Sequence, residues 1–348
     1  MTRAAFAIPG NIDLPTGGYA YARRVLALLP KFGVEVRHLA LPGSFPTPTA
    51  PDLTETGRLL AGVSAPEVVL ADGLAYGALP ADLIAGVSAP IVALVHHPLC
   101  LEAGLGDARQ RELHALEQAA LGLARRIVTT SHATARTLIA DFAVPAARIT
   151  VAEPGTDPAT RAPADGRPLR LLAVGSVVPR KAYDILMRAL APLGAHDWRL
   201  TIAGATDRSA EALSALQAAI AESGLASRVE LVGPMSEVAL ARHYASADIF
   251  VLPSLYEGYG MALAEAMARG LPIVCTTGGA AADTAPATAA LKVPPGDAAA
   301  LRTALLTLFE DAALRRRLAD GSWAAGQALP RWEDTARTIA RVLEEVAR

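Results

Sequence analysis

The sequence predicts an α/β protein built from two doubly wound, Rossmann-like domains, and three observations support this prediction. Strand-like and helix-like patterns alternate from one end of the chain to the other. They fall into two series separated by a proline-rich segment. The length of 348 residues exceeds what one ordinary core requires and suits two domains. Because such alternation forms parallel sheets with both faces covered, each series predicts one domain.

The first series holds six short runs typical of strands, with helical patterns between them. The strands are predicted at residues 4–8, 34–39, 67–70, 91–95, 126–130 and 149–152. Amphipathic spacing predicts helices at residues 19–29, 107–124 and 133–142. Ligands of such domains bind where the strands end, so candidate site residues are sought there.

The second series repeats this organisation after a linker. Its strands are predicted at residues 169–174, 199–203, 228–232, 249–252 and 273–276, and its helices at 183–193, 210–223 and 238–245. The stretch 153–168 carries four prolines and three acidic residues, with almost no apolar run. We therefore predict domains at 1–157 and 169–329, a linker at 158–168, and a C-terminal helix at 330–348.

Composition excludes several classes of protein. Hydrophobic residues make up 52% and charged residues 19%, which excludes a disordered chain. The net charge of −2, without a dense Lys/Arg stretch, argues against dedicated nucleic-acid binding. No apolar run approaches the ~20 residues that span a bilayer, and the first ten residues do not resemble a signal peptide. With only Cys100 and Cys275, neither a disulfide scaffold nor a zinc site is expected. We expect a soluble, cytoplasmic protein.

The segment 248–276 is the strongest candidate for chemistry. A strand leads into a loop with Gly258 and Gly260, followed by a helix and another strand. Glycines allow close backbone approach, and the N–H groups at a helix start can bind phosphate. Glu257 in the loop and Glu265 in the helix suit hydrogen bonds to ribose or sugar hydroxyls. The alternative is an ordinary βαβ turn with a solvated glutamate.

A second candidate follows the strand 169–174, where a glycine precedes Arg180 and Lys181. Two adjacent cations after a strand that ends in glycine describe a diphosphate clamp. Only three of the 32 basic residues are lysine, so Lys181 is a lysine retained where arginine is the usual cation. The alternative is a basic helix start on the surface.

Two further candidates lie in the first domain. Gly17 and Gly18, between the first strand and first helix, let the backbone approach a ligand, although they can also serve only as a flexible loop. His96 ends the strand 91–95, where the alternative is a hydrogen-bonded core histidine. A zinc site with His97 is disfavoured because no other cluster has ligand spacing.

These motifs resemble family 4 glycosyltransferases, which are retaining enzymes of the GT-B fold, with two Rossmann-like domains facing each other across a deep cleft. Their signature is two glutamates separated by seven residues in a glycine-rich context. The matching residues are Ser254, Glu257, Gly258, Tyr259, Gly260, Glu265, Ala266, Met267, Ala268, Gly270 and Pro272. The resemblance is dense in the second domain and only topological in much of the first.

The resemblance implies a role for each matching position. Glu257 would contact the donor sugar and Glu265 the ribose, while the backbone of Gly258, Tyr259, Gly260 and Met261 would hold sugar and diphosphate. Met235, in the loop after the strand 228–232, would contact the base. In the first domain, Gly17 and Gly18 would approach the donor phosphates and the acceptor, and His96 the anomeric region of the sugar.

The phosphate-binding motif departs from the family pattern. Lys181 matches the family lysine that neutralises the leaving phosphates. Ser176 stands where the family has an arginine, and Ala182 replaces a glycine. Arg180, four residues along from Ser176, is expected to compensate.

The resemblance predicts transfer of a hexose from a nucleoside diphosphate sugar, UDP- or GDP-linked, to a hydroxyl of a saccharide, lipid or small-molecule acceptor. It implies no cofactor and no divalent metal, and that the C-terminal helix packs back toward the first domain. Arg23 and Arg24 suggest peripheral contact with the inner face of a membrane, and the oligomeric state stays open. Two alternatives remain: a GT-B epimerase or hydrolase, and a non-catalytic nucleotide-sugar-binding module, which the serine at position 176 leaves open.

Overall fold

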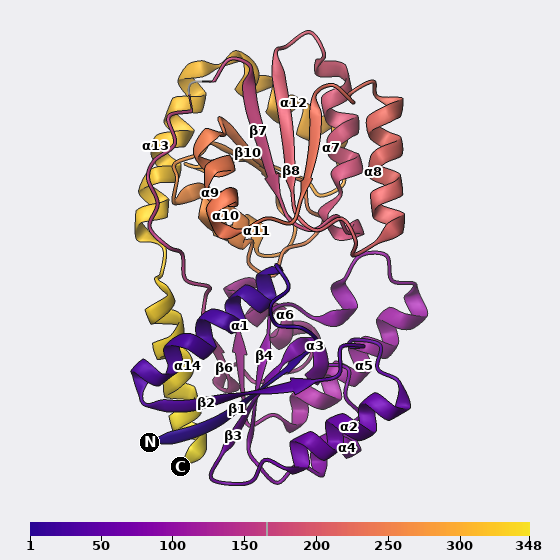
Figure 1. The fold of residues 1–348 in the computed structure, drawn as a ribbon, viewed down its shortest axis with the longest axis vertical. Helices are drawn as coiled ribbons and strands as arrows, with labels where there is room; N and C mark the ends of the chain where they lie inside the picture. Colours follow the sequence, from indigo (N-terminus) through magenta and orange to yellow (C-terminus); the bar gives the residue numbers. More distant parts are fainter. Residues whose placement is uncertain (165) are drawn as a thin grey trace. The chain divides into compact units, whose positions relative to one another are not determined.

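The computed structural model describes residues 1–164 and 166–348, which form two compact units. Unit 1 consists of Met1–Gly155 with Pro330–Arg348, and unit 2 of Thr156–Leu329. Each unit contains one six-stranded sheet whose paired strands are all parallel (Figure 1). The predicted doubly wound α/β class is therefore confirmed for both units.

The sheet of unit 1 has the strand order β2-β1-β3-β4-β5-β6. The strands are β1 (Thr2–Pro9), β2 (Val34–Leu41), β3 (Val68–Asp72), β4 (Ile91–Val95), β5 (Arg126–Thr129) and β6 (Ile149–Val151). Every residue of β3 and β4 is buried. This explains why every residue of these two strands except Asp72 is apolar, because a parallel strand covered on both faces has no polar side.

Seven α-helices cover this sheet in the described residues. They are α1 (Gly17–Leu28), α2 (Ala50–Ala61), α3 (Gly73–Tyr76), α4 (Ala81–Ala85), α5 (Asp107–Leu123), α6 (His132–Asp141) and α14 (Trp332–Ala347). The C-terminal helix α14 packs beside α1, and both chain ends lie in this unit (Figure 1). It buries an apolar stripe that includes Trp332, Ile339 and Leu343.

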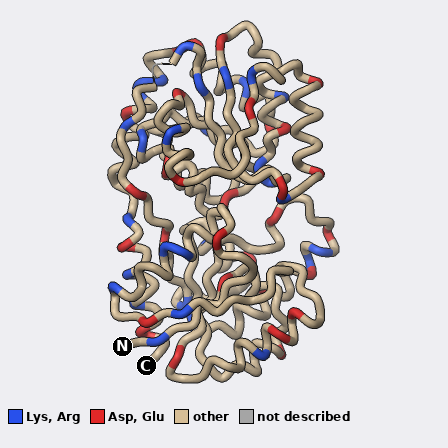
Figure 2. The backbone as a smooth tube through the Cα atoms, in the orientation of Figure 1, with Lys and Arg blue, Asp and Glu red and all other residues tan. Residues whose placement is uncertain are grey.

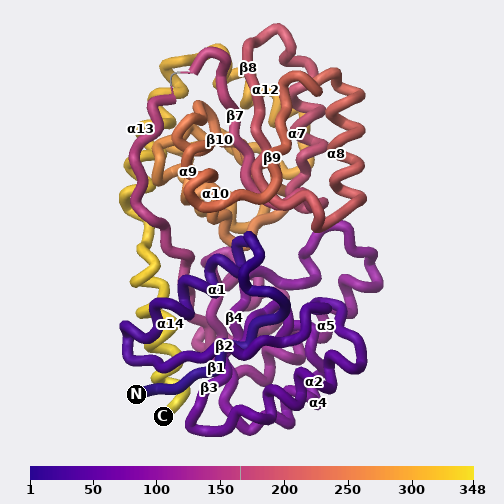
Figure 3. The backbone as a smooth tube through the Cα atoms, in the orientation of Figure 1, coloured from indigo at the N-terminus to yellow at the C-terminus, as the bar shows by residue number. Residues whose placement is uncertain are grey.

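The sheet of unit 2 has the strand order β12-β11-β10-β7-β8-β9. The strands are β7 (Leu169–Val174), β8 (Trp198–Ala203), β9 (Val229–Gly233), β10 (Ile249–Leu252), β11 (Ile273–Thr276) and β12 (Ala290–Val293). The sequence patterns indicated the first five and not β12. Figure 3 shows β8 between β7 and β9.

Helices lie on both sides of this second sheet. They are α7 (Tyr183–Leu190), α8 (Ala210–Glu222), α9 (Glu237–Ser246), α10 (Met261–Met267), α11 (Ala281–Thr284), α12 (Ala298–Glu310) and α13 (Ala312–Ala328). α7 packs with α8 and α12, while α10 packs with α13 (Figure 1). Figure 2 shows acidic and basic residues interspersed in both units.

The predicted linker, residues 158–168, lies within unit 2 except for Asp165, which is outside the described residues. The Ala162 N–H donates to the carbonyl of Arg269 at 2.9 Å. The buried carboxyl group of Asp248 accepts from the N–H groups of Gly166 and Arg170, both at 2.7 Å. These bonds attach the start of unit 2 to its sheet.

No helix in the described part of the chain is long and apolar enough to span a membrane.

Candidate functional site

Three adjacent strands of unit 2 end in glycine at the carboxyl edge of the sheet. Gly175, Gly204 and Gly233 follow or end β7, β8 and β9, with φ of +149°, +155° and +69°. A Cβ atom on Gly204 would lie 2.1 Å from the carbonyl oxygen of Gly175, and one on Gly175 would lie 2.7 Å from Cε of Lys181. This bare backbone lets Lys181 lie directly against the end of β7.

Arg180 and Lys181 come from a single 3₁₀ turn, Pro179–Lys181, between β7 and α7. The turn ends at Ala182, whose φ of +50° and ψ of +40° are left-handed. This conformation accounts for the glycine that the family has here, since a Cβ atom strains it. The N–H of Leu255 donates to the Arg180 carbonyl at 2.8 Å, and Nη1 of Arg180 donates to the Tyr256 carbonyl at 2.7 Å. The turn is thereby tied to the loop that follows β10.

Glu257 lies in that loop, and its backbone is held by the segment after β11. Its N–H donates to the Gly278 carbonyl at 3.2 Å, and its own carbonyl accepts from the N–H of Ala280 at 2.8 Å. A Cβ atom on Gly279 would lie 2.4 Å from the Glu257 carbonyl oxygen. Glycine at position 279 is therefore required for this approach, which holds the backbone of Glu257 in place.

The Glu257 carboxyl group faces both cations of the 3₁₀ turn. Nζ of Lys181 donates to Oε1 at 2.7 Å, and Nη1 of Arg180 lies 3.5 Å from Oε2. The side chains are 12%, 16% and 8% exposed for Lys181, Arg180 and Glu257. Burial raises the pKa of Glu257, but the positive charges of Lys181 and Arg180 outweigh it and hold the pKa at about 2. The cluster thus carries two positive charges and one negative charge near neutral pH.

Glu265 lies one turn into α10 and is partly buried. Burial raises its pKa, and this is opposed by a hydrogen bond with the Tyr244 hydroxyl and by the charge of Arg269. The Arg269 guanidinium lies 4.7 Å from the centroid of the Tyr244 ring. The sequence pattern did not single out Tyr244, because it occupies an ordinary helix position in α9.

The other predicted site residues of unit 2 lie in the loops that follow β7, β9 and β10 and at the start of α10. α10 begins at Met261, directly after Gly260, whose φ is +92°. Tyr259 is buried, and its carbonyl accepts from the Thr284 hydroxyl at 2.6 Å; Gly258 is partly exposed. The remaining two are partly buried: Ser176 follows Gly175, and Met235 follows β9 by two residues and packs on the core beneath α9 and α10.

In unit 1 the structure brings Gly18 and His96 together. Gly17 and Gly18 begin α1, after the cap residue Thr16, and His96 directly follows β4. A Cβ atom on Gly18 would lie 3.7 Å from Nε2 of His96. The side chain of Asp72, which ends β3, lies 3.6 Å from the same nitrogen. The candidate residues of this unit therefore lie at the carboxyl edge of its sheet, as the doubly wound fold predicts.

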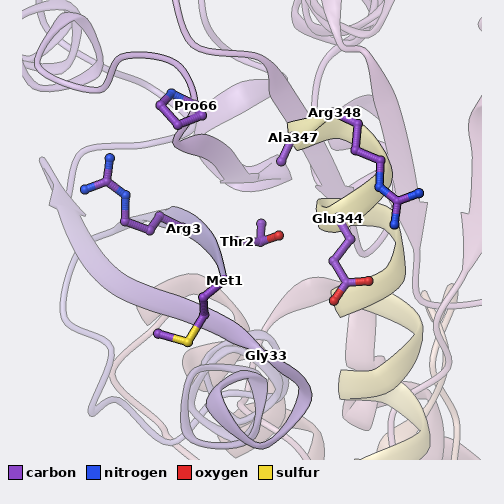
Figure 4. A pocket seen from close by; sticks show the side chains of 8 residues that line it. All are labelled: Met1, Thr2, Arg3, Gly33, Pro66, Glu344, Ala347 and Arg348. Atoms are coloured by element: carbon purple, nitrogen blue, oxygen red, sulfur yellow. The ribbon is translucent and has the colours of Figure 1, made fainter.

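A cavity of about 580 Å³ lies elsewhere in unit 1 (Figure 4). Its lining residues are Met1, Thr2, Arg3, Gly33, Pro66, Glu344, Ala347 and Arg348. Because Thr2 begins β1 and Gly33 precedes β2, this is the amino-terminal edge of the sheet, where doubly wound folds do not bind their ligands. None of the candidate site residues lines it. No group of three or more metal-ligating side chains occurs among the described residues.

Two family models match the chain, one in each half. The model described as Glycosyltransferase Family 4 matches residues 32–160, and the model described as Glycosyl transferases group 1 matches residues 168–311. Among curated proteins, an MMP alpha-(1->4)-mannosyltransferase of Mycolicibacterium hassiacum is 31% identical over 278 residues, 75% of this chain and 67% of that protein. A D-inositol 3-phosphate glycosyltransferase of Kineococcus radiotolerans is 32% identical over 241 residues, 61% of this chain and 55% of that protein.

Solved structures match along almost the whole chain. A sucrose-phosphate synthase from Thermosynechococcus elongatus has a TM-score of 0.82 at 21% identity and covers 99% of both chains. HepE of Anabaena, in complex with UDP-glucose, has a TM-score of 0.79 at 18% identity, over 99% of this chain and 100% of HepE. At these identities the likeness shows the fold, which is GT-B.

Proposed function

The chain belongs to glycosyltransferase family 4 and is a glycosyltransferase, and we propose that it transfers a hexose from a nucleoside diphosphate sugar to an acceptor hydroxyl with retention of anomeric configuration. One observation carries the proposal. A buried, ionised Glu257 is held between Lys181 and Arg180, next to the glycine-ended strands of unit 2. Two cations beside one carboxylate suit a substrate that combines a diphosphate with a sugar.

Each member of the cluster has a distinct chemical task. A carboxylate accepts hydrogen bonds only, so Glu257 is suited to hold sugar hydroxyls. Lys181 and Arg180 stabilise the negative charge that develops on the leaving diphosphate. By analogy with oxyanion sites, losing one such preorganised contact costs about 3–4 kcal/mol of transition-state stabilisation.

Arg180 is proposed to take the place of the arginine that the family has at position 176. Ser176 carries no charge, whereas the Arg180 guanidinium lies 3.5 Å from the same carboxyl group that pairs with Lys181. Both cations therefore act from one turn of backbone, η4 (Pro179–Lys181). A planar guanidinium can bind two phosphate oxygens at once, which suits it to this role.

The remaining contacts follow from the family match. In unit 2, Glu265 is proposed to bind the ribose and Met235 the base, with the backbone of Gly258, Tyr259, Gly260 and Met261 on the sugar and diphosphate. In unit 1, Gly17 and Gly18 are proposed to approach the phosphates and the acceptor, and His96 to contact the sugar. We propose a UDP- or GDP-linked hexose. The name of the mannosyltransferase relative supports a hexose, and that of the HepE complex with UDP-glucose supports a UDP-linked donor.

We further propose that the reaction needs no cofactor and no divalent metal, since Lys181 and Arg180 supply the positive charge. The acceptor is proposed to be a saccharide, lipid or small molecule, and the name of the D-inositol 3-phosphate glycosyltransferase supports the last of these. The free, buried Cys100 and Cys275 support a reducing, cytoplasmic setting.

Peripheral membrane contact through Arg23 and Arg24 has little support in their contacts. Arg23 donates to the carbonyls of Ile12 and Leu14, and Arg24 lies 5.8 Å from the centroid of the Trp332 ring. Sedimentation with anionic vesicles tests this contact. If the contact exists, the wild-type protein sediments with the vesicles and the Arg24→Gln variant does so less.

The decisive experiment measures nucleoside diphosphate release and sugar transfer with UDP-glucose, GDP-mannose and ADP-glucose, with and without EDTA. We expect one donor to be used, EDTA to have no effect, and the product to keep the donor's anomeric configuration by NMR. Lys181→Ala is expected to lower kcat about 10²–10³-fold, while Lys31→Ala, an exposed lysine of unit 1, serves as the control.

Other outcomes point to the other candidates. Donor binding without turnover indicates a binding module, and sugar release or epimerisation without any acceptor indicates a hydrolase or epimerase. Full activity of Lys181→Ala contradicts the proposed role of the cluster.

A further inference from the structure

Two strand ends of unit 1 place an aspartate beside the candidate histidine. β3 and β4 are neighbours in the sheet, with Asp72 paired to Leu94. Oδ2 of Asp72 lies 3.6 Å from Nε2 of His96, and the side chains are 5% and 23% exposed. That ring nitrogen is buried and has no hydrogen-bond partner among the described residues. A buried ring nitrogen of this kind needs a group that determines whether it carries a proton.

The rest of the histidine is held in place by other contacts. The Tyr21 ring meets the His96 ring edge to face, with centroids 5.3 Å apart, and its hydroxyl donates to the Ala152 carbonyl at 2.9 Å. The His96 carbonyl accepts from the hydroxyls of Thr130 and Thr134, both at 3.2 Å. These contacts fix the position of the ring without Asp72. The remaining role for Asp72 is to influence which of the two ring nitrogens carries the proton.

The two oxygens of Asp72 have separate partners. Oδ1 accepts from the N–H of Leu74 at 2.8 Å and caps α3, whereas Oδ2 faces the histidine. A separation of 3.6 Å is too long for a hydrogen bond. It is short enough for the carboxyl group to favour the form of the ring whose N–H points at it.

We propose that Asp72 is a positioning residue of the transfer reaction, which holds the proton of His96 on Nε2 and leaves Nδ1 as a hydrogen-bond acceptor for the substrate. This inference rests on the proposed contact of His96 with the sugar. An acceptor nitrogen receives a hydrogen bond from a sugar hydroxyl, whereas the opposite tautomer presents a second donor to it and orients the sugar differently.

Asp72→Asn separates this role from the capping role. Asparagine caps a helix as well as aspartate does, so its oxygen keeps the bond from Leu74. The amide NH₂ replaces the oxygen that faces His96. Its positive end disfavours an N–H at Nε2, so the ring proton is expected to move to Nδ1. Asp297→Asn is the matched control, because Asp297 caps α12 of unit 2 through the N–H groups of Ala299 and Ala300.

The test has a spectroscopic arm that needs neither donor nor turnover. The ring ¹⁵N chemical shifts of His96, assigned by their loss in His96→Gln, report the tautomer in the full chain. We expect the proton on Nε2 in the wild-type protein and in Asp297→Asn, and on Nδ1 in Asp72→Asn. An unchanged tautomer in Asp72→Asn overturns the inference, even in a fully active enzyme.

The kinetic arm uses a double-mutant cycle. We expect Asp72→Asn to lower kcat about 10-fold to 100-fold with little change in KM, and to cause no additional loss in the His96→Ala background. Losses that multiply in the double variant mean that Asp72 acts independently of His96, which overturns the inference. Failure of the proposed function appears separately, as absence of transfer by the wild-type protein with every donor.

Discussion

Glu257 keeps its negative charge inside the protein because two cations face it at 2.7 and 3.5 Å. Burial alone would favour the neutral acid, and such an acid would donate a hydrogen bond as well as accept one. The balance set by Lys181 and Arg180 therefore determines what the residue can recognise. Because the pKa of Glu257 is lowered, the cluster also stabilises the fold, and this stabilisation depends on pH.

Glu257→Gln is expected to lower the free energy of unfolding by about 3 kcal/mol at pH 7, because a pKa of about 2 replaces an ordinary value of 4.5 on folding. A lowered pKa stabilises the fold above the unfolded value, and this stabilisation is lost as the pH falls toward 2. The difference between wild type and variant should thus be constant above pH 5 and shrink to about 1 kcal/mol at pH 3.

Urea unfolding at several pH values measures this difference. Glu345→Gln is the control, because Glu345 is 56% exposed in its ion pair with Arg126 and should contribute less than about 1 kcal/mol. A Glu257→Gln difference that does not change between pH 7 and pH 3 would show that Glu257 is not held ionised by its neighbours.

Most candidate site residues could be found in the sequence because their chemistry is local. The motif around Glu257 and Glu265 and the pair Arg180–Lys181 are short segments, each recognisable alone. The contact between Asp72 and His96 could not be predicted in this way. It joins the ends of β3 and β4, and the sequence alone does not show that these strands are neighbours in the sheet. The link between Tyr244 and Glu265 is hidden for the same reason, since it depends on how α9 packs against α10.

At the scale of elements, the glycines that end β7, β8 and β9 define the carboxyl edge of the second sheet. The sequence shows a glycine at the end of each of these strands, but only the strand order β7-β8-β9 shows that the three glycines are neighbours. The structure shows why one of them tolerates no side chain. The carbonyl of Gly175 occupies the space that a Cβ atom on Gly204 would need.

Gly204→Ala is expected to destabilise the protein by about 3 kcal/mol or more, because it combines a backbone clash with a φ of +155°. Gly122→Ala in α5 should have the opposite sign and stabilise by about 0.5 kcal/mol, since among the described residues no atom beyond the local helix backbone lies within 4 Å of its Cβ position. Thermal and urea unfolding of both variants measure the effects. A neutral Gly204→Ala would mean that the ends of β7 and β8 can separate without cost.

Helix α5 holds another buried carboxyl group, that of Glu117, which is 1% exposed. One oxygen accepts from the N–H of Leu99 at 2.8 Å, in the turn that follows His96, and the other has no hydrogen-bond partner among the described residues. Burial raises the pKa of Glu117 to about 8, although the bond from Leu99 opposes this shift. The group is therefore neutral in the folded protein near pH 7.

The free energy of unfolding of the Glu117→Gln variant is expected to exceed that of the wild type by an amount that grows as the pH rises. A raised pKa means that the folded state holds a proton which the unfolded state releases above pH 4.5, so wild-type stability falls between pH 4.5 and 8. Glutamine imitates the neutral acid and loses nothing over this range. We expect near-equal stability at pH 4.5 and an advantage of about 3 kcal/mol for the variant at pH 7, by urea unfolding. A constant difference across this range would show that Glu117 is ionised in the fold.

At the scale of the whole molecule, the two doubly wound sheets were predictable because each strand and helix pattern lies within a short segment. The prediction for unit 2 missed β12, whose two middle residues, Leu291 and Lys292, are only partly buried. The packing of α14 into unit 1 could not be derived from its own sequence. The apolar stripe of an amphipathic helix predicts that the helix packs on a core, but it does not predict which of two cores.

The last helix, α14, belongs to the same unit as the first strand, β1. Each unit has its own buried core, so each should unfold as its own cooperative step. Leu343 in α14 and Leu305 in α12 are both fully buried. Leu343→Ala should lower the stability of unit 1 by about 3 kcal/mol and leave unit 2 unchanged, and Leu305→Ala should do the reverse.

Hydrogen exchange followed by mass spectrometry in increasing urea resolves the two steps, because peptides report each unit separately. In Leu343→Ala, protection in β1 and β3 should be lost at lower urea while protection in β7 and β10 stays as in the wild type. Nucleoside diphosphate binding by unit 2 should then persist at urea concentrations that unfold unit 1, because Lys181, Arg180 and Glu257 all belong to unit 2. Simultaneous loss of protection in both units would mean instead that the chain folds as one cooperative body and that α14 stabilises the whole of it.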